Sequence, residues 1–147
     1  MRHLVRATLP VLLVSMILAV AVRADEAPYT EGSVMEMTFV RVTPGGDEAY
    51  LKYLDAQWKA LNEAAKTNGL ILSYHIIQTA AANKDDWNMV LVVEYKNMAA
   101  LDGLETKMRA LVEKTFGSID KAEQQTAKRG EIREIIGEKI GRELILK

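Results

Sequence analysis

The sequence predicts an α+β fold in which an antiparallel sheet carries its helices on one face. Two observations lead to this prediction: segments typical of strands alternate with segments of helical periodicity, and turn residues separate them. Strand-like segments, rich in β-branched and aromatic residues, occur at 33–42, 70–79, 87–95 and 143–146. Segments with apolar residues at helical spacing occur at 47–68, 98–116 and 120–136.

The first strand and the first helix have clear boundaries. The strand ends at the turn Pro44-Gly45-Gly46. The helix that follows carries a single apolar stripe, which is typical of a buried face. The stripe is formed by Leu51, Leu54, Trp58, Leu61 and Ala65. The helix is expected to end near Asn68-Gly69, because glycine can adopt the left-handed conformation that closes a helix.

The order of the remaining segments completes the fold prediction. A polar loop at 80–86 joins the second and third strands, and Gly117-Ser118 separates the second helix from the third. The order is therefore β-α-β-β-α-α-β, which is the split βαβ pattern of ferredoxin-like domains with one additional helix before the last strand. We expect this domain at 34–147, preceded by an N-terminal extension at 25–33.

Both faces of the predicted sheet are apolar. In the second strand, alternation places Ile71, His75 and Ile77 on one face and the neighbouring apolar residues on the other. The third strand also has valines on both faces. Helices cover one face only, and monomers rarely expose a large apolar patch. We therefore expect a homodimer in which two sheets pack together; the alternative is that the third helix wraps over the second face.

The first 24 residues have the features of a cleavable signal peptide. Arg2, His3 and Arg6 make a positively charged start, and a nearly continuous apolar run follows from Leu9 to Val22. Small or compact residues then precede a cleavage point after Ala24. The apolar run is shorter than the roughly 20 residues that span a bilayer, so an uncleaved membrane anchor is the less favoured alternative. The expected location is the periplasm or the exterior.

The composition of residues 25–147 excludes several classes of function. Removing the three arginines of residues 1–24 leaves 16 basic against 20 acidic residues, a net charge of −4. A mildly acidic domain without a basic patch is a poor match for nucleic acid or an anionic membrane. The chain has no cysteine, which excludes a thiol nucleophile, a redox disulfide and a thiolate metal site.

Three stretches together resemble a known superfamily. A strand that ends in RVTPGG, the helix DEAYLKYLDAQWKAL, and the strand-to-helix segment VLVVEYKNMAALDGL are similar to the dimeric α+β barrel superfamily. This group includes the antibiotic-biosynthesis-monooxygenase-like and EthD-like proteins. The resemblance implies a dimeric barrel and a pocket between sheet and helices within each subunit. Because its members include oxygenases, haem-degrading enzymes and isomerases, it does not choose a chemistry.

His75 is the one histidine beyond residue 24 and the candidate catalytic residue. Apolar neighbours on its strand face predict that it is at least half buried, either as a hydrogen-bonded core residue or as a general base. Ser73 lies two positions away, where strand side chains stand about 7 Å apart. That separation, without an evident acidic partner, argues against a serine hydrolase.

The candidate ligand pocket is formed by aromatic residues and His75. If the second and third strands form a symmetric hairpin, His75, Trp87, Met89 and Tyr95 share one face. That face can bind a flat apolar or aromatic ligand, with His75 as the polar group, or form the dimer interface. Trp58 fits the buried stripe of its helix and can also match a pocket tryptophan.

No cofactor or metal is predicted. The resemblance implies that haem-binding members take an axial histidine from a helix, and no helix beyond residue 24 contains one. A zinc site would depend on carboxylates for all but one ligand. Two function classes therefore remain. One is an exported protein that binds a small molecule or acts as an accessory factor. The other is a cofactor-independent oxygenase or isomerase for a small aromatic substrate, with His75 as base.

Overall fold

The computed structural model describes residues 26–147, except for the side chains of residues 125–128. The expected signal peptide at 1–24 lies outside the described residues. No helix within 26–147 has the length and hydrophobicity needed to cross a membrane.

A four-stranded antiparallel sheet forms one layer of the molecule. Its strands are β1 (Tyr29–Val42), β2 (Ser73–Gln78), β3 (Met89–Tyr95) and β4 (Arg133–Leu146), in the spatial order β2-β3-β1-β4. β1 pairs with β3 through Val34–Val40 and with β4 along nearly its whole length. This strand order and the α+β class confirm the ferredoxin-like prediction.

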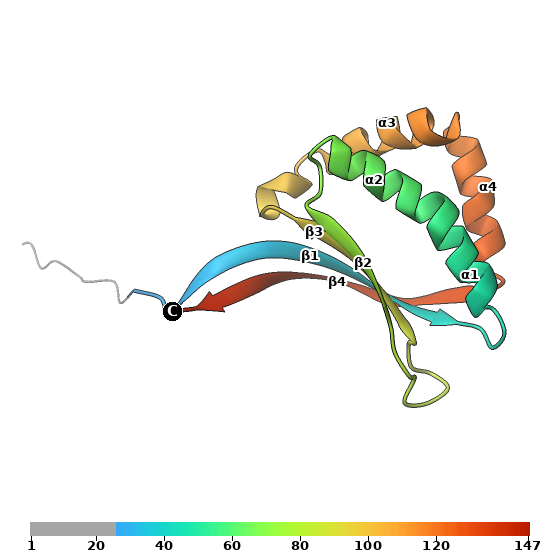
Figure 1. Ribbon diagram of the computed structural model, residues 1–147, viewed down its shortest axis with the longest axis horizontal. Helices are drawn as coiled ribbons and strands as arrows, with labels where there is room; N and C mark the ends of the chain where they lie inside the picture. Colours follow the sequence, from blue (N-terminus) through green and yellow to red (C-terminus); the bar gives the residue numbers. More distant parts are fainter. Residues whose placement is uncertain (1–25) are drawn as a thin grey trace, which may run out of the picture.

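The helices form the second layer, and all of them lie on one side of the sheet (Figure 1). The segment between β1 and β2 is one continuous helical rod made of α1 (Asp47–Tyr53), the π-helical turn η1 (Leu54–Trp58) and α2 (Lys59–Thr67). After β3 come a 3₁₀ turn η2 (Met98–Leu101), α3 (Leu104–Phe116) and α4 (Ile119–Arg129). α4 is the predicted additional helix before the last strand.

Two apolar clusters join the layers. The first combines the β1 and β3 ends near the Pro44 turn with α1 and η1, and contains Val40, Val42, Tyr50, Leu54, Met89 and Leu91. The second lies at the other end of the sheet and contains Val34, Ala65, Ile71, Tyr95 and Leu111. Alternate residues of β1 and β3 supply both clusters, as the period of two requires. The helical layer is therefore held over β1, β2 and β3.

The last helix and the last strand have different lengths from those predicted. α4 ends at Arg129, and β4 begins at Arg133, so residues 133–142, all of which precede the strand expected at 143–146, belong to β4. Gly137 and Gly141 are poor helix formers, and the β-branched residues between Arg133 and Ile140 favour a strand. The pairing partner that stabilises this strand is β1, far away in the sequence, so local periodicity alone was misleading.

β1 also begins earlier than expected. Residues 29–33, assigned to an extension, pair with the end of β4, so that Tyr29 lies opposite Leu146. Beyond the last pair of β1 with β3, β1 and β4 continue together as a two-stranded ribbon that projects past the helices (Figure 1). Apolar side chains on this ribbon, such as Leu144 and Ile145, are at least half exposed.

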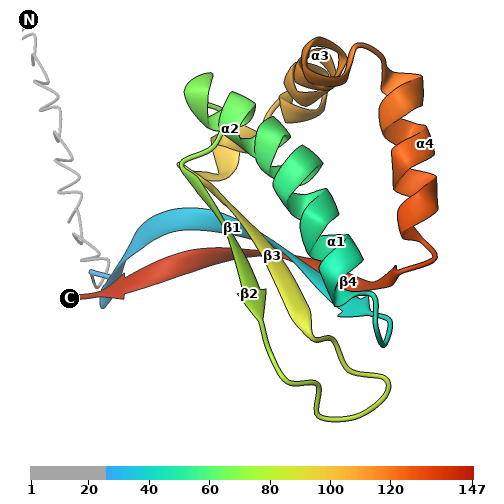
Figure 2. The same ribbon diagram turned by 45° about the vertical axis from the view of Figure 1, so that its right-hand side comes forward.

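The opposite face of the sheet carries no helix from the described residues 26–147 (Figure 1). α4 lies on the same side as α1 and α3 (Figure 2), and Arg129 at its end stacks over the ring of Tyr53 in α1 at 4.2 Å. The alternative in which the third helix covers the second face is therefore wrong. The strand register places six apolar residues on that face: Met35, Met37, Phe39, Ile77, Val90 and Val92. We call this uncovered side of the sheet the bare face.

Candidate ligand-binding site

A cavity of about 190 Å³ lies between the sheet and the helical rod. Its apolar wall combines side chains from both layers, namely Trp58, Leu61, Ile71, Leu91, Val93 and Met108. Four polar residues line it as well: Glu36, Thr38, Asn62 and Tyr95. An apolar cleft with a few convergent polar groups is the usual form of a small-molecule site.

The π-helical turn η1 aligns the helical side of the cavity. In this turn the Lys59 N–H donates to the Leu54 carbonyl, a bond one residue longer than in an α-helix. The Trp58 carbonyl accepts a 2.8 Å hydrogen bond from the side chain of Asn62, which is only 4% exposed. Because that bond uses one of the two amide N–H groups, the side chain retains a second donor and its oxygen.

Trp58 is held from a second direction by the sheet. Its ring meets the ring of Tyr74 on β2 edge to face, with the centroids 5.2 Å apart. Tyr74 is itself anchored by a 2.6 Å hydrogen bond from its hydroxyl to Glu63, and this bond raises the pKa of Tyr74 to about 12. The indole that lines the cavity is thus fixed between α2 and β2.

The sheet side of the cavity contains a carboxylate and a phenol. Glu36 lies on the helix-facing side of β1, two residues from the fully buried Val34. The Tyr95 hydroxyl on β3 donates a 2.7 Å hydrogen bond to Glu36 Oε2. Burial raises the pKa of Tyr95, and the bond to Glu36 raises it further, so the phenol remains a donor.

Of the four predicted pocket residues, the structure brings two together. Trp58 and Tyr95 both line the cavity between the layers. His75 lies opposite Val92 on the bare face, and the ring of Trp87 packs at a tilt against the ring of Phe39 on the same face, with ring centroids 5.1 Å apart.

The expectation that His75, Trp87, Met89 and Tyr95 share one face is wrong. Met89 and Tyr95 are buried under the helices. Strand alternation does not extend to Trp87, because β3 begins at Met89 and Asn88 bonds to Val40 and Val42 in an irregular connection. Ile71 also differs from expectation: it precedes β2 and is buried in the helix-side core rather than beside His75.

His75 is exposed in this chain, not half buried as expected. Its Nε2 lies 3.1 Å from Ser73 Oγ, which corrects the expected separation, because the imidazole extends along the strand toward the hydroxyl. Ser73 Oγ donates a 2.5 Å bond to Glu94 Oε2. The acid therefore contacts the serine and not the histidine, which is not the order in which a catalytic triad activates a hydroxyl.

Glu94 is the charged centre of this polar cluster on the bare face. The hydroxyls of Ser33 and Ser73 that face the carboxylate lower the pKa of Glu94, and the nearby His75 has a smaller effect in the same direction. Ser33 Oγ is buried and makes no hydrogen bond of full geometry within the described residues, so the bond from Ser73 is the defined contact.

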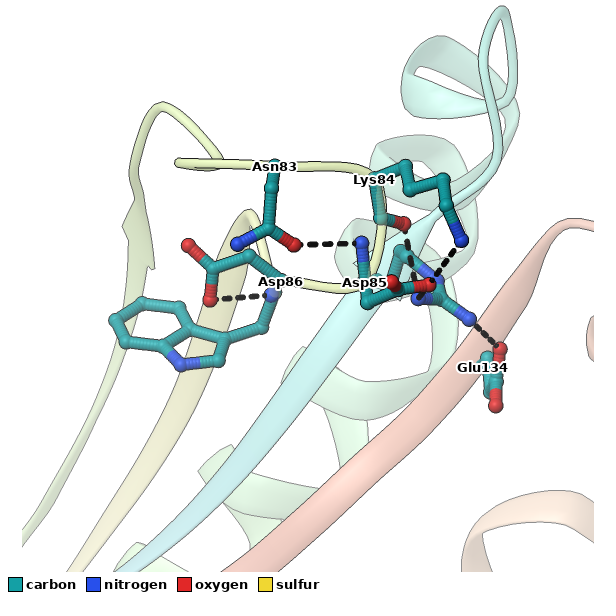
Figure 3. Close-up of polar contacts among 7 residues, drawn as sticks. Asn83, Lys84, Asp85, Asp86 and Glu134 are labelled. Carbon is teal, nitrogen blue, oxygen red and sulfur yellow. Dashed lines mark hydrogen bonds and ion pairs between the residues drawn. The ribbon is translucent and has the colours of Figure 1, made fainter.

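A second pocket, of about 450 Å³, lies beside the loop between β2 and β3. Arg41 lines its edge. Its guanidinium donates to the Lys84 carbonyl at 3.0 Å and pairs with Glu134 and Asp85 (Figure 3). Because these partners already neutralise the guanidinium, Arg41 does not offer a free positive charge to a ligand in this pocket.

Sequence reasoning missed Glu36 and Asn62 as site residues. Alternation along β1 places Glu36 between Val34 and Thr38 on one face. A carboxylate on the face that packs against the helices indicates a candidate site residue, and this pattern is present in the sequence. Asn62 follows Trp58 by four residues, the spacing of neighbours on a helix. No group of three or more metal-ligating side chains is present within the described part of the chain.

The comparisons with known proteins concern the fold. No protein-family profile matches the chain, and no curated protein is similar to it. The solved structure of HapK from Hahella chejuensis is similar with a TM-score of 0.49 and 14% sequence identity, over 75% of this chain and 91% of HapK. A dimeric ferredoxin-like protein from an uncultured marine organism has a TM-score of 0.42 and 15% identity, over 80% and 98% of the two chains.

Proposed function

We propose that this is an exported small-molecule-binding protein that holds its ligand in the cavity between sheet and helices. The observation that carries the proposal is the convergence of Glu36, Asn62 and Tyr95 on one cavity walled by Trp58. Buried polar groups of this kind give a ligand orientation, while the apolar wall supplies affinity. The cavity volume of about 190 Å³ suits a ligand group of about one ring, since an apolar cavity of about 150 Å³ accommodates benzene.

We further propose that the protein acts as a homodimer joined through the bare face. Phe39, Trp87 and Lys139 border a pocket of about 220 Å³ there, and Lys139 Nζ lies 5.6 Å from the centre of the Phe39 ring. Methionine and aromatic side chains are enriched in interfaces, and exposed apolar patches mark them. Two copies related by a twofold axis would cover both patches at once.

An enzyme that uses His75 as its base is less well supported. His75 is exposed on the bare face, whereas the cavity lies on the other side of the sheet. A base separated from the ligand by the sheet cannot reach a proton of that ligand, because transfer needs contact within hydrogen-bond distance.

The two tryptophans allow a direct test of the binding site. The chain has only Trp58 and Trp87, so Trp87→Phe leaves one indole in the cavity and Trp58→Phe leaves one on the bare face. Titration with benzyl alcohol should change the emission of Trp58 in the first variant and leave Trp87 unchanged in the second. A response from Trp87 alone would move the ligand site to the bare face and overturn the proposal.

Export has its own test. Mass spectrometry of the protein recovered from the periplasm or medium of its host should give a chain that begins at Asp25. A chain that retains residues 1–24 in the membrane fraction would instead establish an anchor.

A further inference from the structure

The charge of the cavity is not balanced. Glu36 is the one charged residue among those lining side chains that the structure describes. None of the described side chains, which are those of residues 26–124 and 129–147, forms an ion pair with Glu36. By contrast, Glu31 and Glu134, at the two ends of the sheet, are each paired with an arginine. A half-buried carboxylate without a cation is stabilised when a cation is brought to it.

The hydrogen bonds leave the carboxylate ready to accept more. Tyr95 donates to Oε2, and the raised pKa of its hydroxyl keeps it a donor rather than a competing anion. An ionised carboxylate has about four lone-pair positions and no proton to give. Oε1 of Glu36 has no hydrogen bond from the described side chains, so the ligand that completes this group must be a donor.

Trp58 supplies a surface that favours the same kind of ligand. The face of an indole is the aromatic surface that attracts cations most strongly. Trp58 and Glu36 line one cavity of about 190 Å³, which is small enough for one compact group to contact both. An anionic ligand would face the carboxylate without any basic side chain in the lining to offset the repulsion.

We propose that the ligand of this cavity is a small amine, bound as its ammonium ion and carried on one ring or a short apolar chain. This inference rests on the proposed function and specifies the ligand class of the same site. The ammonium group donates to Glu36 Oε1, and the apolar part fills the space between Trp58, Leu91 and Met108. The second amide N–H and the oxygen of Asn62 remain available to bind other polar groups of the amine. These contacts distinguish one amine from another.

Three probes of equal size and different charge test the proposal. Benzylamine, benzyl alcohol and benzoate are each titrated into the Trp87→Phe variant at neutral pH, with Trp58 emission as the readout. Benzylamine should bind at least about tenfold more tightly than benzyl alcohol, as expected for a charge-assisted bond, and benzoate most weakly. Glu36→Gln in the same background keeps the shape and should make benzylamine and benzyl alcohol equal. Circular dichroism of that variant establishes that it is folded.

The outcomes separate the two proposals. If benzylamine and benzyl alcohol bind equally to the Glu36 protein, the amine inference is overturned while the ligand cavity stands. If none of the three probes changes the emission of Trp58, the ligand cavity itself is overturned. A preference for benzylamine that survives Glu36→Gln would place the cation elsewhere and also overturn the inference.

Discussion

The side chain of Asn62 bonds to the backbone carbonyl of Trp58, four residues earlier in the same helical rod, over 2.8 Å. This contact lies where the rod changes from π-helical to α-helical hydrogen bonding. π-helical turns inside helices occur frequently at functional sites. The same contact therefore stabilises the irregular turn and fixes Trp58 and Asn62, two of the helical residues that line the cavity.

Replacing Asn62 by alanine should destabilise the protein measurably. The change removes the donor to the Trp58 carbonyl and leaves a gap in a buried position, which costs about 1–3 kcal/mol of the free energy of unfolding. Asn68→Ala is the matched control, because Asn68 makes the same type of bond to Ala64 over 2.7 Å at an exposed site. Urea unfolding measures both variants; equal losses would show that burial of Asn62 adds nothing.

The stability of the protein should fall as the pH rises above 10. The pKa of Tyr95 is raised from its ordinary value of 10.0 in the folded chain, so folding favours the neutral phenol. Its contribution is complete below pH 10 and is lost progressively at higher pH, because the unfolded chain then releases its proton first.

Tyr95→Phe should make this alkaline loss of stability smaller, whereas Tyr29→Phe, at an exposed position near the chain end, should leave it unchanged. Denaturation midpoints measured across the alkaline range provide the comparison. A parallel pH dependence of the Tyr95→Phe variant and the parent would show that other groups cause the loss.

Ile77→Lys should dissociate the proposed dimer. Ile77 is 50% exposed on the bare face, where a charge would be buried against the second copy. Ile76→Lys is a near-perfect control, since Ile76 is the next residue of β2, is 40% exposed and points to the helix side.

Sedimentation velocity should give a monomer for the Ile77 variant and a dimer for the Ile76 variant. A dimer that withstands Ile77→Lys, or an unmodified chain that is monomeric, contradicts assembly through this face. Emission of Trp87, which lies on the bare face, should respond to dissociation while Trp58 does not.

Arg41→Gln should release the loop between β2 and β3. The guanidinium connects the Lys84 carbonyl and Asp85 to Glu134 on β4 (Figure 3), and glutamine cannot span these groups. Hydrogen exchange of residues 80–86 should become faster while the exchange of α3 stays the same. Lys84→Gln removes only an exposed pair with Asp85 and should have little effect. Unchanged exchange in the Arg41 variant would mean that the loop is held by Asn83 and Asp86 alone.

The positions of individual elements could be predicted where their signals are local. The buried stripe of the first helix, the Pro44 turn and the apolar strand β3 each depend on spacing within one short segment. The structure has all three, except that Leu51, predicted in the stripe, is 42% exposed and Tyr50 is buried in the first cluster instead. The α+β class follows from their order. The position of Trp58 on the cavity also follows from its helix stripe, because a helix repeats its face every 3.6 residues.

By itself, then, the sequence determined the fold class, the element order and the apolar character of both sheet faces, because these depend on side-chain periods of 2 and 3.6 within single segments. Only the tertiary structure decided which residues meet. Pairing with β1 turned residues 133–142 into a strand. The irregular connection at Asn88 placed Trp87 and Met89 on opposite faces of the sheet. The meeting of Glu36 with Tyr95 depends on the register of β1 against β3. Such register is set by packing between distant segments, which no local pattern records.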